Sequence, residues 1–163
     1  MKNVPALPAV LVVDDEVRSQ EALRRTLEED FTVFTASGAD EAMAIMEREQ
    51  GASGGKGVQV VLCDQRMPGT SGVAFLTEVR QRWPDVVRIV LSGYTEAGDI
   101  IAGINEAGIY QYLLKPWQPE QLLLTLKSAA NVWRLQQDNQ RLSLELRAAE
   151  PVLASKVEMK YER

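Results

Sequence analysis

Polar side chains follow each of four apolar runs in this chain, and their types suit phosphoryl transfer. Asp14 and Asp15 follow the run at 10–13, Asp64 follows 58–63, Ser92 follows 86–91 and Lys115 follows 110–114. Side chains at the C-terminal ends of parallel strands lie where open α/β sheets bind their ligands. An aspartate can accept a phosphoryl group as an acyl phosphate, provided that the charge on the phosphoryl oxygens is offset.

Asp64 is the candidate nucleophile of this set. Asp14 and Asp15 would repel it unless a cation lay among the three carboxylates, and such a donor set suits Mg²⁺, a hard ion that prefers oxygen ligands. Lys115 would offer a positive charge to one phosphoryl oxygen, and Ser92 would offer a hydrogen bond to another. Each residue alone has an ordinary explanation, such as a helix cap or a turn, but their combination at four strand ends favours a phosphoryl site.

This chemistry requires a sheet that brings the strand ends together. Apolar runs of strand length alternate with segments whose apolar residues recur at helical spacing, a pattern typical of βαβ units and a parallel sheet. Near-continuous apolar strands indicate that helices cover both faces of the sheet. Strands are predicted at about 9–13, 31–35, 58–63, 86–91 and 110–114.

Helices are predicted between these strands and after the last one. The first follows Glu16 and should bury Ala22, Leu23 and Leu27 on one face. The second begins near residue 37 or 39. Pro84 should stop the third, and Gly108 should terminate the fourth.

A long helical pattern begins at Pro119. Beyond residue 130, apolar residues recur in steps of three and four with one polar break, which is typical of a heptad seam. Leucines so far beyond a five-stranded domain favour pairing with a second copy of the chain over a plain surface helix. We expect a folded domain at 1–130, a coiled-coil linker helix at 131–150 that ends at Pro151, and a tail at 151–163. The predicted seam consists of Val132, Leu135, Asn139, Leu142 and Leu146.

Composition narrows the classes of protein. The chain has 163 residues, 45% of them apolar, which suffices for one domain with a core plus an appendage. A net charge of −5 argues against direct nucleic-acid binding, and no apolar run is long enough to cross a membrane. The only cysteine, Cys63, lies in an apolar run, so a reducing cytoplasm is predicted.

The sequence contains no histidine, which excludes Ser-His-Asp and Cys-His catalysis within the chain. A phosphohistidine donor would therefore have to lie on another protein. A hydrolase of the haloacid dehalogenase type is rejected as well, because it needs Asp-x-Asp at the nucleophile and Arg66 stands two positions after Asp64.

With these residues in view, the chain closely resembles the receiver domain of two-component response regulators over roughly residues 8–130. The resemblance implies a CheY-like, flavodoxin-like fold, a doubly wound five-stranded parallel sheet in the order 2-1-3-4-5, here with a C-terminally extended helix. The matching motifs are Val12-Val13-Asp14-Asp15-Glu16, Asp64-x-x-Met67-Pro68-x-x-x-Gly72, Ser92-Gly93 and Lys115-Pro116.

The resemblance implies roles for the acidic residues. Asp64 would be phosphorylated by a partner sensor histidine kinase. Asp15, Asp64 and the main-chain carbonyl of Arg66 would bind Mg²⁺ directly, and Asp14 would contribute partly through water. Receivers dephosphorylate themselves only slowly, so the chain is not expected to be an enzyme.

The resemblance also implies a switch. Ser92 and Lys115 would contact the phosphoryl group, and Tyr112 falls at the family's switch aromatic position, whose ring turns inward when the hydroxyl residue moves toward the phosphate. A half-buried strand tyrosine is the alternative for Tyr112.

A narrower resemblance is to receivers of hydrogenase-regulating transcription factors of the NtrC family, built as receiver, ATPase and helix-turn-helix. It implies an output ATPase and DNA-binding domain after the tail, and the seam of the long helix predicts a homodimer whose geometry responds to phosphorylation. Receivers attached to cyclic-di-GMP phosphodiesterases share the same Lys-Pro-Trp motif and are one alternative. A constitutive dimerisation module that is rarely phosphorylated is another. The residues that carry the resemblance are 63–69, Ser92-Gly93-Tyr94-Thr95 and Leu114-Lys115-Pro116-Trp117.

Overall fold

A computed structural model describes residues 6–51, 57–93 and 97–161 of the chain. Tyr94 and Thr95 of the 92–95 motif and the last two residues of the predicted tail lie outside the described residues. By its internal contacts the chain divides into two units, residues 1–133 and 134–163.

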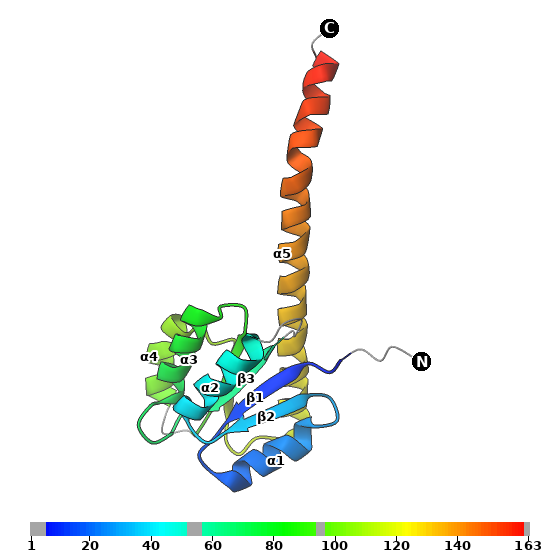
Figure 1. The fold of residues 1–163 in the computed structure, drawn as a ribbon. Helices are drawn as coiled ribbons and strands as arrows, with labels where there is room; N and C mark the ends of the chain where they lie inside the picture. Colours follow the sequence, from blue (N-terminus) through cyan, green and yellow to red (C-terminus); the bar gives the residue numbers. More distant parts are fainter. Residues whose placement is uncertain (1–5, 52–56, 94–96, 162–163) are drawn as a thin grey trace. The chain divides into compact units, whose positions relative to one another are not determined.

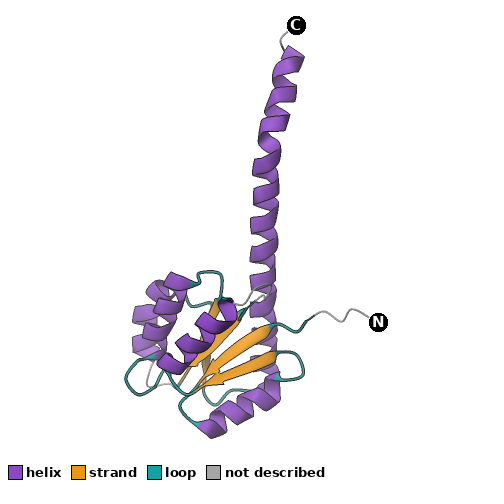
Figure 2. Cartoon of the chain, viewed as in Figure 1, coloured by secondary structure: helices purple, strands orange, loops and turns teal. Residues whose placement is uncertain are grey.

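The first unit contains a five-stranded parallel sheet in the order β2-β1-β3-β4-β5, which confirms the predicted fold class (Figure 2). The first strand matches its predicted range, and the other four are displaced slightly: the second and fourth begin and end one residue later, the third begins two residues later and ends on Asp64, and the fifth begins one residue later. The strands are β1 (Ala9–Val13), β2 (Thr32–Ala36), β3 (Val60–Asp64), β4 (Val87–Ser92) and β5 (Gln111–Leu114).

Helices alternate with the strands as predicted. Gly108 follows α4 with a φ of +59°, a left-handed value that glycine adopts without a side-chain clash and that commonly ends helices. Trp83, just before Pro84, caps the end of α3. The helices are α1 (Val17–Leu27), α2 (Ala39–Gln50), α3 (Gly72–Arg82), α4 (Ala97–Ala107) and α5 (Pro119–Tyr161).

Helices cover both faces of the sheet, with α2, α3 and α4 on one face and α1 and the first part of α5 on the other (Figure 1). Successive strand residues point to opposite faces, so Leu11 packs with the α2–α4 side and Val12 with the α1–α5 side. Burial on both faces explains why the strands are apolar throughout. This double layer fixes the strand ends at one edge of the sheet.

The buried face of α1 differs from the prediction at one residue. Leu23 and Leu27 are fully buried as expected, but Ala22 is exposed and Gln20 is buried in its place. Residues 20, 23 and 27 have the i, i+3, i+7 spacing of one helix face, so the buried stripe is rotated from the predicted one and includes a polar residue.

The end of α5 also differs from the prediction. Pro151 does not terminate the helix, which continues to Tyr161. Proline removes one hydrogen bond and crowds the preceding turn, but its φ of about −65° is itself a helical value, so it does not force the chain out of the helix. None of the described helices has the length and apolar composition needed to cross a membrane.

Candidate functional site

Sheet pairing brings the predicted residues to one edge. Val13 of β1 pairs with Cys63 of β3, so Asp14 and Asp64 follow directly on neighbouring strands. On the other side of β3, Asp64 pairs with Leu91 of β4, one residue before Ser92. Ser92 pairs in turn with Leu114 of β5, and its carbonyl accepts a hydrogen bond from the Lys115 N–H at 2.8 Å.

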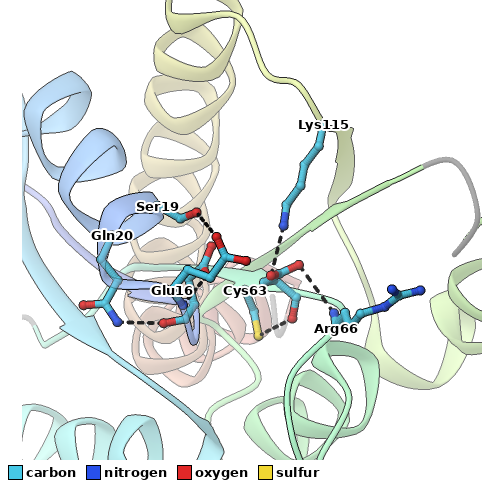
Figure 3. Close-up of polar contacts among 8 residues, drawn as sticks. Glu16, Ser19, Gln20, Cys63, Arg66 and Lys115 are labelled. Carbon is cyan, nitrogen blue, oxygen red and sulfur yellow. Dashed lines mark hydrogen bonds and ion pairs between the residues drawn. The ribbon is translucent and has the colours of Figure 1, made fainter.

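Asp14 is buried and held by bonds to three neighbours. Its N–H donates to the carbonyl of Ala36 on β2 at 3.0 Å, and its carboxylate Oδ1 accepts from the N–H of Glu16 at 2.9 Å. The Nε2 of Gln20 donates to its carbonyl at 2.6 Å (Figure 3). The start of α1 is thus tied to the ends of β1 and β2, which fixes the Asp14 backbone.

Asp64 is buried and engaged at both carboxylate oxygens. Lys115 Nζ lies 2.9 Å from Oδ2, and the Arg66 N–H donates to Oδ1 at 3.4 Å (Figure 3). The lysine reaches in from the loop after β5 with its side chain 37% exposed. A positive charge and a backbone donor therefore already face the carboxylate that the sequence predicts to be the nucleophile.

Asp14, Asp15 and Asp64 each present a carboxylate oxygen within 4.8 Å of the other two. Burial raises the pKa of Asp14, and the negative charges of Asp64 and Asp15 act in the same direction, against the lowering effect of the Glu16 N–H and Lys115. The Asp14 Oδ2 atom is buried and lacks a hydrogen-bond partner within the described part of the chain. Crowded carboxylates with one oxygen left unsatisfied fit a hard divalent cation such as Mg²⁺.

Ser92 carries a second unsatisfied group. Its side chain is fully buried at the end of β4, and its Oγ makes no hydrogen bond to any described residue. Buried hydroxyls almost always find a partner, so this one marks a position where an acceptor can be accommodated.

The loop from β3 to α3 is held close to Asp64 by a glycine. A Cβ built on Gly72 would lie 2.5 Å from the Asp64 carbonyl oxygen, so no larger residue fits without displacing the backbone. Ser71 caps the helix, its Oγ accepting from the Ala74 N–H at 3.1 Å. Position 72 of the 64–72 motif therefore requires glycine for a steric reason.

Other predicted residues lie away from the acidic cluster. The Arg66 side chain is exposed, and Tyr112 is 40% exposed on β5, at the edge of the sheet. Tyr112 and Trp117 line a groove of about 370 Å³ beside the start of α5. The tyrosine is thus in an outward position.

The predicted seam begins in the first unit and continues in the second. Val132 is half-buried and packs against the α1–α5 core, so its side chain is already used by the folded domain. In the second unit the apolar seam residues are exposed: Leu135 by 52%, Leu142 by 50% and Leu146 by 65%. Asn139 is exposed as well.

Cys63 is a core residue. Its Sγ donates to the Asp64 carbonyl at 3.3 Å, and burial, together with the charges of Asp64 and Asp14, raises the pKa of the thiol well above its usual range. Cys63 therefore belongs to the packing of the core and is no exposed thiolate.

Sequence reasoning missed two buried glutamines, Gln20 and Gln65, which hold the loops that carry the acids. Gln20 had a detectable signal, because it shares a helix face with Leu23 and Leu27 and a polar residue on such a face must find a partner. Gln65 had none, since it follows a strand without any periodic pattern.

Comparisons with known proteins agree with this geometry. The profile of the response regulator receiver domain matches residues 10–127. The hydrogenase transcriptional regulatory protein HoxA of Cupriavidus necator is 59% identical over 93% of this chain and 30% of its own length; its namesake in Bradyrhizobium diazoefficiens is 54% identical over 85% and 27%. The chain thus spans less than a third of either relative. A receiver domain crystal structure from Clostridium thermocellum aligns with a TM-score of 0.72 and 30% identity, over 80% of this chain and 99% of that one.

Proposed function

The chain belongs to the response regulator receiver family, and on that basis we propose that it accepts a phosphoryl group on Asp64 from the phosphohistidine of a partner sensor kinase. The observation that carries the proposal is the Asp64 carboxylate itself, buried beside Lys115 Nζ at 2.9 Å and among two further carboxylates. The 163 residues contain no histidine, so the donor histidine has to lie outside this chain. Such a chain is a signalling module and not a conventional enzyme.

The transfer would use the polar groups on this edge of the sheet together with a bound cation. An Asp64 carboxylate oxygen forms a bond to phosphorus while the phosphorus–nitrogen bond of the donor breaks, and the released imidazole nitrogen takes a proton from solvent. Lys115 offsets charge on one phosphoryl oxygen, and Ser92 donates its unused hydroxyl hydrogen to another. Bound Mg²⁺, held by Asp14, Asp15, Asp64 and the Arg66 carbonyl, would offset the remaining charge.

Phosphorylation is proposed to change the face formed by α4, β5 and α5. Movement of Ser92 toward the phosphoryl group would vacate space beneath β5, and Tyr112, now outward, would turn into it. The same change would alter how the helix beyond residue 131 pairs in a homodimer.

The longer protein is proposed to be a transcriptional regulator. Support comes from the two relatives whose names state hydrogenase transcriptional regulation, since high identity extends over most of this chain. The receiver would occupy 1–130, and the linker from 131, which is helical through Pro151 to Tyr161, would lead to ATPase and DNA-binding domains. We propose that the protein acts in the cytoplasm, where the phosphorylated domain of the partner kinase would also lie.

The phosphoacceptor is tested by incubating the chain with acetyl phosphate and Mg²⁺ and resolving the phosphorylated form on phosphate-affinity gels. Wild type should be modified once per chain, and Asp64→Asn should not be modified. Asp40→Asn, which changes an exposed aspartate on α2, is the matched control and should behave as wild type. Modification of Asp64→Asn at the wild-type level would refute the assignment.

A constitutive dimerisation module is a second candidate, favoured by the exposed leucines of the seam. It predicts a dimer whose affinity does not change when beryllofluoride, a phosphate mimic, is added with Mg²⁺. The phosphorylation switch predicts a large change. Sedimentation equilibrium of the whole chain with and without the mimic distinguishes the two.

A further inference from the structure

Gln65, the residue after the proposed phosphoacceptor, joins three elements of the fold. Its N–H donates to the Leu91 carbonyl of β4 at 2.9 Å, and its own carbonyl accepts from the Gly72 N–H at 2.9 Å. Its side-chain Oε1 accepts from the Val73 N–H, also at 2.9 Å, in a buried hydrogen bond. Only 6% of the residue is exposed.

These bonds close the base of the β3–α3 loop. The first N–H groups of a helix have no partner within the helix, and here Gln65 supplies acceptors for two of them, at Gly72 and Val73, while Ser71 serves Ala74. The side-chain bond is the one that depends on residue type, because any residue at position 65 has a backbone N–H and carbonyl, proline excepted.

The loop closed in this way begins with Arg66, which is bonded covalently to Gln65. The Arg66 N–H donates to Asp64 Oδ1, and its carbonyl is a proposed Mg²⁺ ligand. Loss of the Gln65 side-chain bond would remove one of the three hydrogen bonds that close the loop and would allow both groups to shift relative to Asp64.

We infer that Gln65 is a positioning residue that sets the Mg²⁺ affinity of the acidic site by anchoring the Arg66 peptide to the first turn of α3. The inference rests on the proposed function, since it assumes that the site binds Mg²⁺. Residues that orient metal ligands from behind alter affinity by about 10–100-fold when they are changed, and the buried Gln65–Val73 bond would act in this way through the Arg66 peptide.

The test is a calorimetric titration of the whole chain with Mg²⁺. Gln65→Met keeps the length and removes the acceptor, and it should weaken binding by about tenfold, the lower end of such effects. Gln59→Met is the matched control, because Gln59 is equally buried at the opposite end of the same strand region and makes its hydrogen bonds through its main chain. It should leave the affinity unchanged, even where thermal unfolding shows that both variants lose stability.

Gln65→Glu separates positioning from packing. A carboxylate still accepts the Val73 N–H and is favourable at a helix N-terminus, so this variant should not show the loss of Mg²⁺ affinity expected of Gln65→Met, and a loss as large would count against the Val73 contact as the cause. Should Gln65→Met fail to fold, Gln65→Asn, one methylene too short to reach Val73, undergoes the same titration and should also bind weakly.

Wild-type affinity in the folded Gln65→Met or Gln65→Asn variant would overturn the inference, and so would equal weakening by Gln59→Met. These results leave the proposed function intact, because wild type still binds Mg²⁺ and is phosphorylated. Failure of wild type itself to bind Mg²⁺ or to accept phosphate would instead overturn the proposed function together with the inference.

Discussion

The edge of the sheet that carries the acidic residues has two halves, and they differ in how firmly their polar groups are held. On the half formed by the ends of β1 and β3, Asp14 and Asp64 are buried and bonded to backbone groups of neighbouring elements. On the half formed by the ends of β4 and β5, the Ser92 hydroxyl is buried without a partner among the described residues, and Tyr112 is 40% exposed.

This difference suits a domain that binds with one half and responds with the other. A carboxylate fixed by its backbone loses little freedom when a ligand arrives, so the acidic half is preorganised. An unsatisfied buried hydroxyl costs about 1–3 kcal/mol, and a phosphoryl oxygen would remove that cost. The responding half therefore gains stability only when the binding half is modified.

The largest expected effect comes from breaking the ion pair between Lys115 and Asp64, which joins the two halves by their side chains. Lys115→Met should slow phosphorylation by acetyl phosphate about 100-fold, because loss of a single charge-stabilising donor at a reacting oxygen costs 10²–10³ in rate. Lys127→Met, which removes an exposed lysine paired with Asp30, should react at the wild-type rate. Initial rates on phosphate-affinity gels measure this, and comparable rates for wild type and Lys115→Met would contradict the role of the lysine.

A smaller effect, on the binding of a phosphate mimic, is expected from a change in the responding half alone. Ser92→Ala should weaken beryllofluoride binding about tenfold, the loss of one hydrogen bond to a charged group. Stability without the mimic should not fall, because the hydroxyl lost has no partner to leave behind. Ser71→Ala should by contrast lower the free energy of unfolding by about 1 kcal/mol through loss of a helix cap. Urea unfolding measures the stabilities. A loss of stability in Ser92→Ala as large as that in Ser71→Ala would show that the Ser92 hydroxyl has a stabilising partner after all.

The smallest effect is expected from a change in the binding half, at Asp14, on the free energy of unfolding of the metal-free chain. Burial raises the pKa of Asp14, so the folded chain holds this proton more tightly than the unfolded chain. The free energy of unfolding therefore falls as the pH rises from 3.8, the ordinary pKa of the group, through the raised pKa of the folded chain, because the charged carboxylate is disfavoured in the fold. Asp14→Asn should raise the free energy of unfolding at neutral pH by about 1 kcal/mol, the typical size of a single-residue effect.

Urea unfolding of metal-free Asp14→Asn and wild type across pH measures this difference, which should vanish below 3.8. Asp40→Asn, an exposed aspartate, should show no such gain. A stability advantage of Asp14→Asn that grows toward low pH would have the wrong sign and would contradict burial as the cause.

Most of the fold follows from local patterns. The alternation of apolar strands with helical spacing predicted all ten elements, with strand ends displaced by one or two residues, because burial on both faces leaves a continuous apolar run. The strand order came from the family resemblance, since no local pattern specifies which parallel strands are neighbours. Ala22 was placed wrongly because its apolar neighbours allow two overlapping helix faces, and only packing selected the one through Gln20.

The order of residues along the chain was enough to predict that polar side chains stand at the strand ends and share one edge of a parallel sheet: Asp14, Asp15, Asp64, Ser92 and Lys115. Tertiary structure decided how each is held: which oxygen of Asp64 meets Lys115, that Ser92 lacks a partner among the described residues, and that Gln20 and Gln65 secure the two acidic loops. The physical reason is the distance along the chain between the groups that interact. Periodicity records burial within one element, whereas these hydrogen bonds join groups from different elements and exist only once the sheet and its helices have packed.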